Sequence, residues 1–556
     1  MSPIYSHRRS ALLATAVFLV LLAAFYVLLS VSGAKPVIEE TEPAAVAPGE
    51  ELIITGSHFG DSRGSSKVRL GGSAPTSSAY VEWSDSRIVI EVPEDATSGL
   101  AYVETERGRS NGVLFANARH VRSEEVGESS SARPVVEQIE PTNAEVGEVV
   151  TIHGRRFGAD RKGGTVSFTL APGAQEDHAV GSSGRAGRVP VSEQVEGYEY
   201  WSPGEIRVRV PDGAVSGSVI VRTARGESEG REITIDQPVG EKRFVDRQSH
   251  AVAASVTLDS VQISEDGEDG TVFLWIPQIV RSPEQRNHEK LTESKSPLFA
   301  PASGPSLYRI RDPRPEEPWS FRRSVLFDRY AVETAIDPDA VPTEYRQSEN
   351  FMRRYTQEDA LLPVDADSVI SVARELGNSS RNPYSRARNT YEYVLSALDP
   401  VDQVGSIGPL EALRDSEANP YGYATLTVTL LRAQNIPARL IGGYVVCGGE
   451  QLQRHYWAEF YIEGFGWVPM DPAAADRAVC ERFRPVENAT EYYFGNVDSR
   501  RIAYSKGVAR VPHMHPEGRT ERVETMYALQ SHHQEAVGDI RWYRVRWHDV
   551  EYLGKY

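Results

Sequence analysis

The pattern of apolar and polar positions divides the chain into four stretches of different character. Residues 11–30, ALLATAVFLVLLAAFYVLLS, are continuously apolar. From residue 36 onward, short runs such as ELIITG and SRIVIEVP alternate apolar and polar residues between Gly and Pro, which predicts β-strands. From residue 364 the spacing becomes helical, as in DADSVISVARELG and ARNTYEYVLSALDP. Strand-like alternation returns after residue 492 and continues to the end.

The apolar N-terminal run predicts a transmembrane helix over residues 11–33, because about 20 apolar residues span a bilayer core. Arg8 and Arg9 precede it, which predicts a cytoplasmic N-terminus of ten residues and a single-pass membrane protein. A cleaved signal peptide, cut near residues 32–34, is the alternative. Both interpretations place the bulk of the chain outside the cytoplasm, in the periplasm or at the cell surface.

The first β-rich stretch contains a duplication. Residues 38–60, IEETEPAAVAPGEELIITGSHFG, match residues 136–158, VEQIEPTNAEVGEVVTIHGRRFG, at an offset of 98. Further along, Trp83 and Pro93 match Trp201 and Pro211 at an offset of 118, so the second copy carries about 20 extra residues, assigned to a loop over 171–190. Each copy predicts a β-sandwich.

The repeated order of Pro, Gly-Glu, Ile-x-Gly-x-x-Phe-Gly and Trp-Ser resembles the IPT/TIG family of immunoglobulin-like domains. The resemblance predicts one such domain over residues 36–120 and another over 134–238. Members of that family bind proteins or glycans or act as spacers. The next stretch, residues 243–345, is predicted as a further β domain.

Six motifs then occur in a fixed order. They are Tyr423-Ala424, Leu430–Ala433, Asn435–Arg439, Gly443-Tyr444, His455 with Trp457 and Glu459, and Gly466 with Trp467 and Asp471. This order resembles the transglutaminase-like superfamily, which has an α+β papain-like core. The resemblance implies such a core over residues 360–500 and a C-terminal extension packed on it over 501–556.

The chemistry of that family is nucleophilic: a cysteine thiolate at a helix N-terminus attacks an amide carbonyl, a histidine is the base and an aspartate orients it. His455 and Asp471 match the base and the orienting carboxylate. The cysteine position falls on Pro420, which has no nucleophile and no backbone N–H. Proline is nevertheless favoured in the first turn of a helix, and Asn419 can cap it.

Four aromatic residues accompany the two retained triad positions as candidates for lining a cleft. They are Tyr421, Tyr423, Trp457 and Trp467. Each has a structural alternative: the tryptophans can pack in the core, and the hydrogen bond between His455 and Asp471 can fill a buried polar slot. The family resemblance also implies that the strand ends carrying Cys447 and Cys480 lie close, which predicts a disulfide; two free thiols are the alternative.

The net charge and the spacing of the histidines argue against two kinds of binding site. The net charge of −18 argues against binding nucleic acid through phosphates. The clusters HMH (513–515) and SHH (531–533) match no metal-ligand spacing, so neither a metal nor a cofactor is predicted.

Three functions are compatible with these patterns. The first is a membrane-anchored, catalytically inactive transglutaminase-like protein that binds a peptide or protein in the former active-site cleft. The second is an active amide hydrolase or acyltransferase that uses a route without cysteine. The third is a structural spacer of the cell envelope.

Overall fold

A computed structural model describes residues 35–556 of the 556-residue chain. The predicted transmembrane segment lies outside the described residues. Among the helices that are described, none is long and apolar enough to cross a membrane. The gaps in the description are residues 44, 71–72, 94–95, 97–98, 118–132, 162, 172–186, 193–196, 264–269, 302–303, 315–316, 403–404, 449–450, 481–482, 484–485 and 525.

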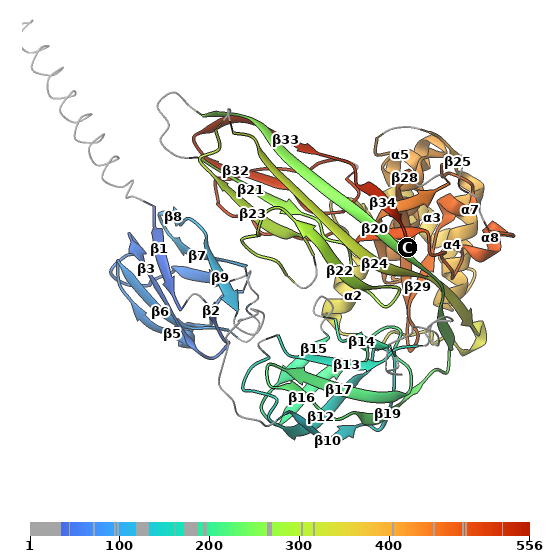
Figure 1. The fold of residues 1–556 in the computed structure, drawn as a ribbon, viewed down its shortest axis with the longest axis horizontal. Coiled ribbons are helices and arrows are strands. Elements are labelled where there is room, and N and C mark those ends of the chain that lie inside the picture. The colour runs from blue at the N-terminus through green and yellow to red at the C-terminus, as the bar shows by residue number, and fades with distance from the viewer. Residues whose placement is uncertain are drawn as a thin grey trace, which may run out of the picture. The chain divides into compact units, whose positions relative to one another are not determined.

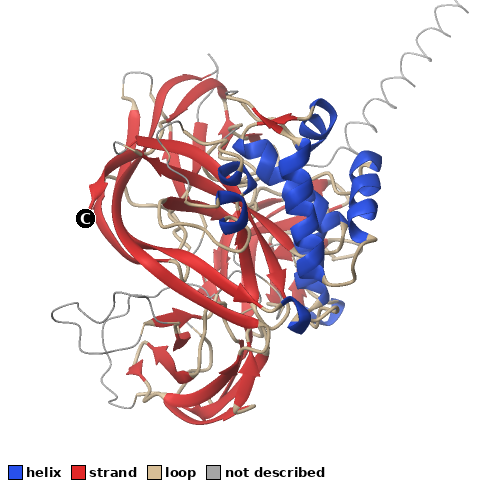
Figure 2. Ribbon diagram, turned by 90° about the vertical axis from the view of Figure 1, so that its right-hand side faces the viewer, coloured by secondary structure: helices blue, strands red, loops and turns tan. Residues whose placement is uncertain are grey.

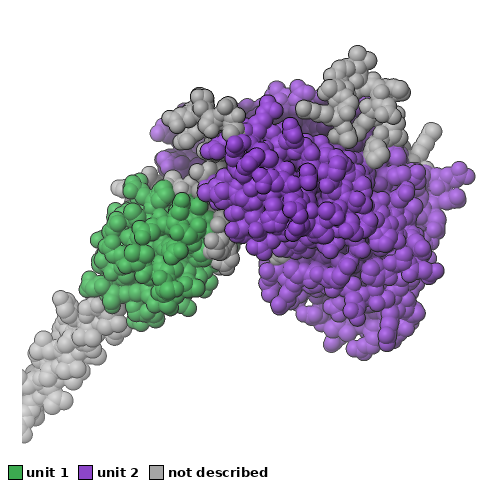
Figure 3. All heavy atoms as spheres, turned by 90° about the horizontal axis from the view of Figure 1, so that it is seen from below, with its two compact units in different colours: residues 1–122, 512–517 green, residues 123–511, 518–556 purple. Residues whose placement is uncertain are grey.

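The described residues divide into two compact units. The first comprises residues up to 122 together with 512–517, and the second comprises residues 123–511 and 518–556 (Figure 3). The multidomain, strand-rich architecture predicted from the sequence is confirmed.

The first unit is a β-sandwich of short strands. One sheet has the order β1 (Val37–Glu42), β3 (Glu51–Ser57), β6 (Arg87–Glu91) and β5 (Tyr80–Trp83); the other has β2 (Ala45–Val46), β9 (Val113–Asn117), β7 (Gly99–Thr105) and β4 (Lys67–Leu70), with β8 (Gly108–Arg109) paired to β7. The alternating apolar residues meet between the sheets, where Ile54, Ile88 and Val103 are fully buried.

The second unit begins with a sandwich that has the same strand order. One sheet contains β10 (Val135–Glu140), β12 (Val149–Arg155), β16 (Glu205–Arg209) and β15 (Tyr198–Trp201); the other contains β11 (Asn143–Glu145), β19 (Arg231–Asp236), β17 (Gly217–Thr223), β13 (Thr165–Thr169) and the additional β14 (Arg188–Pro190), with β18 (Gly226–Glu227) paired to β17. The repeated tryptophan has the same role in both copies: the indole of Trp83 donates to the carbonyl of Phe59, and that of Trp201 to the carbonyl of Phe157.

Two long strands, β20 (Gly240–Ile263) and β24 (Trp319–Ile336), run side by side and lead into a third β region (Figure 1). They form one sheet with β22 (Gln285–Glu293), β33 (Ile540–Trp547) and β34 (Glu551–Lys555). A second sheet has the order β23 (Ser306–Arg311), β21 (Gly270–Ile276), β32 (Gln534–Gly538) and β31 (Arg519–Glu521).

This third region differs from the sequence-based boundaries. The last 56 residues were predicted as an extension on the core, but β31 to β34 belong to the sheets begun by β20 and β21. β33 buries Ile540 and Tyr543 against Val256, Leu274 and other residues of the middle sheets. Among the described strands after residue 500, only β30 (Arg501–Lys506) joins the core sheet.

The remaining core places helices on one side of a four-stranded sheet (Figure 2). The sheet order is β29 (Gly466–Met470), β28 (Gln451–Ile462), β27 (Ala438–Cys447) and β30, and β25 (Asp399–Pro400) pairs with β26 (Glu417–Ala418). The helices are α2 (Glu349–Thr356), α3 (Asp367–Gly377), α4 (Pro383–Ala397), α5 (Pro409–Asp415), α6 (Pro420–Ala433), α7 (Pro472–Ala475) and α8 (Ala489–Tyr492), and a short 3-10 turn at Pro338–Ala340 precedes them. Another 3-10 turn, Ser77–Ala79, lies between β4 and β5 of the first sandwich.

Candidate functional site

Helix α6 begins at Pro420, at the position that the sequence resemblance aligns with a nucleophile. The side chain of Asn419 caps it by accepting a hydrogen bond of 3.1 Å from the backbone N–H of Gly422. Pro420 is the first helical residue, where a missing N–H costs nothing. At the other end, Asn435 takes the left-handed conformation (φ 58°) expected after a helix.

The two tyrosines at the start of α6 are both buried. The ring of Tyr421 packs edge-on against Tyr456 at 5.1 Å between centroids. Tyr423 is fully buried, and its hydroxyl lies 3.1 Å from the carbonyl of Leu398 and also contacts the carboxylate of Asp476. Tyr423 is therefore a core residue, whereas Tyr421 links α6 to the strand that carries His455.

Alternation along β28 separates its side chains into two sets. Tyr456, Ala458 and Phe460 pack in one cluster with Ala424 and other residues of α6. Trp457 belongs to a different cluster, together with Ile441 of β27 and Ala503 of β30. His455 stacks on Trp457 with ring centroids 6.2 Å apart, and it is 0 % exposed. His455 thus lies on the Trp457 side of the strand, away from the residues that pack against α6.

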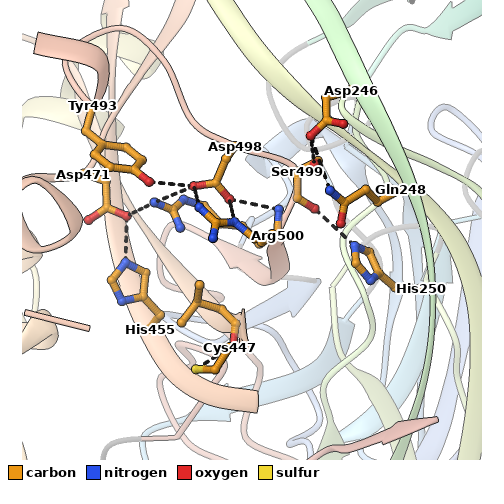
Figure 4. A network of polar contacts seen from close by, with 12 residues as sticks. Asp246, Gln248, His250, Cys447, His455, Asp471, Tyr493, Asp498, Ser499 and Arg500 are labelled. Atoms are coloured by element: carbon orange, nitrogen blue, oxygen red, sulfur yellow. Dashed lines mark hydrogen bonds and ion pairs between the residues drawn. The ribbon is translucent and has the colours of Figure 1, made fainter. Parts of the chain in front are cut away.

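The structure brings His455 and Asp471 together. Nε2 of His455 lies 2.7 Å from Oδ2 of Asp471, and both residues are 0 % exposed (Figure 4). The other carboxylate oxygen, Oδ1, accepts a hydrogen bond of 2.9 Å from the N–H of Ala474 and so caps α7. Nδ1 of His455 has no hydrogen-bond partner among the described residues.

Arg501 of β30 completes this network and was not among the predicted site residues. Its guanidinium lies 2.7 Å from Oδ2 of Asp471, the same oxygen that contacts His455, and 3.6 Å from Asp498. Asp498 also accepts a hydrogen bond of 2.8 Å from the hydroxyl of Tyr493 (Figure 4). The only sequence signal for Arg501 is a charged residue at the start of the apolar run IAY.

Neighbouring charges shift the pKa values of these buried groups, against the effect of burial. Burial alone raises the pKa of Asp471, but His455 and Arg501 more than offset this, so that its pKa lies below the ordinary value. The pKa of Asp498 falls to about 2: burial opposes the shift, and Arg501 and Arg500 cause it. Burial lowers the pKa of Arg501, yet Asp498 and Asp471 raise it above its usual range. All three groups are therefore charged at neutral pH.

Trp467 and Arg439 form a second buried cluster. The guanidinium of Arg439 lies 3.9 Å from the ring centroid of Trp467 and pairs with Glu459 at 2.5 Å. Glu459 also pairs with Lys506 at 2.9 Å. Trp467 packs with Phe351, Tyr355 and Tyr461, which are likewise buried. This arrangement gives Trp467 a packing role.

Cys447 and Cys480 are joined in a disulfide with Cα atoms 6.4 Å apart. The bridge ties the end of β27 to the loop that follows α7, the short helix capped by Asp471. Over the described ranges, no three His, Cys, Asp or Glu side chains are grouped as metal ligands. In the two histidine clusters, Nδ1 of His515 and of His533 each accept a backbone N–H.

Comparison with known families identifies two parts of the chain. Residues 370–472 match the model of the transglutaminase-like superfamily, a range that runs from α3 to the residue after Asp471. Residues 36–117, the first sandwich, match the IPT/TIG domain. No curated protein matches the chain.

Three solved structures overlap parts of the chain. A candidate cysteine protease from Cytophaga hutchinsonii is 14 % identical, with a TM-score of 0.36, and the match covers 56 % of this chain and 93 % of that one. The periplasmic domain of TgpA from Pseudomonas aeruginosa is 14 % identical, with a TM-score of 0.25, and the match covers 47 % of this chain and 94 % of that one. The surface glycan-binding protein PbSGBP-B from Prevotella bryantii is 9 % identical, with a TM-score of 0.18, and the match covers 44 % of this chain and 71 % of that one. We draw no functional conclusion from these likenesses.

Proposed function

We propose that the chain is a transglutaminase-like protein of the cell envelope that has no thiol-dependent catalysis and acts by binding a peptide or protein. Its matched core contains α6 and the His455–Asp471 pair. The observation that carries the proposal is Pro420 as the first residue of α6, the position that the motif resemblance aligns with the family's cysteine. A proline cannot attack a carbonyl, and α6 is intact without a thiol there.

Two further features of the core support the absence of thiol catalysis. The chain contains two cysteines, and both are consumed in the disulfide between Cys447 and Cys480. His455 is fully buried, so that a substrate has no direct access to its imidazole. A general base must come within hydrogen-bond reach of the proton that it removes.

A turnover assay tests this part of the proposal. The full chain is incubated with a glutamine-containing peptide and an amine, and ammonia release and intact mass are followed with and without iodoacetamide. We expect no release above the level of a His455→Gln control and no covalent adduct. Turnover that iodoacetamide abolishes would contradict the proposal. Turnover that resists iodoacetamide but needs His455 would favour the alternative of a route without cysteine.

The proposed place of binding follows from the exposure of Pro420 and His455. Pro420 is partly exposed, whereas His455 is not. A peptide or protein partner would therefore contact the beginning of α6 rather than the histidine. A photo-crosslinking amino acid at position 420 is expected to capture such a partner in intact cells. A crosslinker at Val81, which is 61 % exposed in the first sandwich, is the control. A spacer would give no capture at 420 above that at 81.

The envelope location rests on the apolar segment 11–33 and on the disulfide, since disulfides persist outside the cytoplasm. We expect the chain in the membrane fraction, with the ectodomain open to externally added protease once the outer barrier is removed. Recovery of the full-length chain in the soluble cytoplasmic fraction would contradict this location.

A further inference from the structure

The sheet that contains β20 has two edges, and they differ in how well they are protected. β22 forms one edge and β33 the other (Figure 1). Along β22, the pairing with β24 shifts register twice within residues 286–292, so this strand carries extra residues. Bulges of this kind turn an edge away from a possible partner strand. Residues 542–547 of β33 pair with β20 without an extra residue of their own; the extra residue there is Asp259 of β20.

The backbone on the outer side of β33 is open over most of its length. Among the described strands, β20 is the one that pairs with β33. At its beginning, the side chain of Arg519 donates hydrogen bonds to the carbonyls of Ile540 and Arg541. From Trp542 onward, the outer side of the strand has no paired strand within the described ranges. An open edge of this length can accept a further strand.

The side chains of β33 alternate between the two faces of the sheet. Tyr543 and Val545 pack inside, with the cluster between the two middle sheets. Trp542, Arg544 and Arg546 lie on the outer face: Trp542 is 50 % exposed, and the two arginine side chains are 55 % and 58 % exposed. Tryptophan and arginine are the side chains that most often anchor a protein partner.

The outer face of β33 carries more positive than negative charge. Arg544 and Arg546 share one carboxylate, that of Asp259, at 2.8 and 2.6 Å. Arg541 is exposed, and no carboxylate of the described residues pairs with it. Three arginines of this strand therefore have one carboxylate between them, although the chain as a whole has a net charge of −18. An acidic partner would match this edge.

A second exposed aromatic residue lies on another edge strand, where the charges are balanced. Tyr200 of β15 is 42 % exposed, and the guanidinium of Arg207 lies 4.7 Å from its ring centroid. Arg207 pairs with Glu205 at 3.2 Å, and Arg209 of the same strand pairs with Glu199. Each of these arginines has a carboxylate of its own. An unbalanced positive charge beside an exposed aromatic ring thus distinguishes β33 from β15.

We propose that β33 is a docking edge for an extended, acidic segment of a protein partner, which adds to the sheet as a further antiparallel strand. Main-chain hydrogen bonds to the open side of β33 would supply affinity, and alternate side chains would supply specificity. On the outer face the partner would place an apolar residue beside Trp542 and carboxylates beside Arg544 and Arg546. The inference goes beyond the proposed function and does not rest on it, because it uses no residue at the start of α6.

The test uses a dye-labelled peptide, EVEVLVT, whose glutamates and leucine fall on one face of a strand and whose valines fall on the other. In fluorescence anisotropy we expect it to bind the full chain, with an affinity that falls at least about threefold at high salt. The peptide EVEPLVT, in which proline removes a donor, and the peptide KVKVLVT, with reversed charge, should not bind. Amide hydrogen exchange of residues 540–547 should slow when EVEVLVT binds, because new main-chain hydrogen bonds form there.

Two variants separate the docking edge from other exposed aromatic surface. Trp542→Ala should weaken binding of EVEVLVT at least about fivefold, since truncating an anchoring tryptophan costs that much or more. Tyr200→Ala is the matched control and should leave the affinity unchanged. No binding of EVEVLVT at about 1 mM would overturn the inference. So would equal binding of EVEPLVT, or unchanged exchange of residues 540–547, which can be measured even if Trp542→Ala fails to fold.

Two further results would assign the edge to a different occupant and so also overturn the inference. A concentration-dependent dimer of the natural chain that Trp542→Ala abolishes would show that a second copy pairs with β33. The acidic residues 265, 266, 268 and 269, which follow β20, lie outside the described residues. Tighter binding of EVEVLVT after these four are replaced by their amides would show that the chain's own acidic segment occupies the edge. None of these outcomes bears on turnover or on capture at position 420, so the proposed function is tested separately.

Discussion

The two sandwiches share a sequence pattern and a strand order, but they are used differently. In the first, the buried residues form a cluster that contains only residues of that sandwich, such as Ile54 and Phe115. In the second, the cluster continues from Ile152 into the core, where it includes Trp457 and Ile441. The second sandwich is therefore part of the body that holds the His455–Asp471 pair, and the first forms a unit of its own.

The contacts that join the second sandwich to the core are specific and buried. The ammonium of Lys242 lies 2.5 Å from Asp212 of the sandwich and 2.7 Å from the carbonyl of Trp467 in the core. Val146 forms a β-bridge with Gly464, which follows β28. One sequence-level module can thus be a separate unit in one copy and a structural wall of the core in the other.

The largest loss of stability should follow from truncating equivalent buried residues in the two copies of the sandwich. Ile54 and Ile152 occupy the same position of the repeat, and both are 0 % exposed. Replacing either with alanine removes buried methyl groups and leaves a cavity, at a cost of about 4 kcal/mol. In calorimetry, Ile54→Ala should lower only the transition of the first unit, and Ile152→Ala only that of the larger unit. A common shift of both transitions in either variant would break the comparison.

Removing the ammonium of Lys242 should destabilise the larger unit by about 3 kcal/mol, because it leaves a buried carbonyl and the partly buried Asp212 without their partner. Lys242→Met keeps the apolar length of the side chain and isolates the charge. Chemical denaturation measures the loss. Lys290→Met is the control, since the Lys290 side chain is 62 % exposed and its partner Glu293 also pairs with Arg323. Equal losses in the two variants would show that the buried contact is not what joins sandwich and core.

Acid should destabilise the larger unit through Asp498. The pKa of Asp498 is about 2 in the folded chain and near 3.9 in an unfolded one, so its stabilisation is complete above about pH 4. That stabilisation, about 2 kcal/mol, is lost as the pH falls from 4 to 2. The transition of the larger unit should therefore shift over this range more in the natural chain than in Asp498→Asn. Equal acid sensitivity of the natural chain and the variant would contradict this assignment.

The smallest expected change in stability concerns two glycines at equivalent positions of the repeat. Gly49 and Gly147 both have positive φ, at 83° and 88°. A Cβ added to Gly49 meets nothing within 4 Å, whereas at Gly147 it would lie 2.1 Å from the hydroxyl of Tyr461 in the core. Alanine at Gly49 should cost about 1 kcal/mol from backbone strain alone. Alanine at Gly147 should cost about 2 kcal/mol, because Tyr461 must also move. Equal losses would show that this contact is not tight.

The sequence predicted the sandwiches and the core because their signals are local. Each alternating run, turn signal or capping pattern extends over only a few neighbouring residues. The constant offset between the two copies of the repeat then allowed their strands to be aligned. The start of α6 was also predictable, since Asn419 and Pro420 carry a cap and a first-turn signal.

What the sequence did not predict depends on partners far along the chain. Arg501 acts on a carboxylate 30 positions earlier, and nothing near it in the sequence points to Asp471. The pairing of β33 with β20 joins residues nearly 300 positions apart, so the end of the chain was predicted as an extension on the core instead. The packing of the second sandwich against the core also has no signal in the sequence, because Gly147 occupies the same place in the repeat as Gly49.

The central claim is that the His455–Asp471 pair is a buried structural element and not a reacting centre. Hydrogen–deuterium exchange at the C2 position of histidine, followed by mass spectrometry of the full chain, tests it most directly. His153 of the second sandwich, whose side chain is 40 % exposed, is the internal reference. We predict that His455 exchanges at least about tenfold more slowly than His153 at neutral pH, with or without a glutamine-containing peptide. Exchange of His455 as fast as that of His153 would show an accessible imidazole and contradict the account.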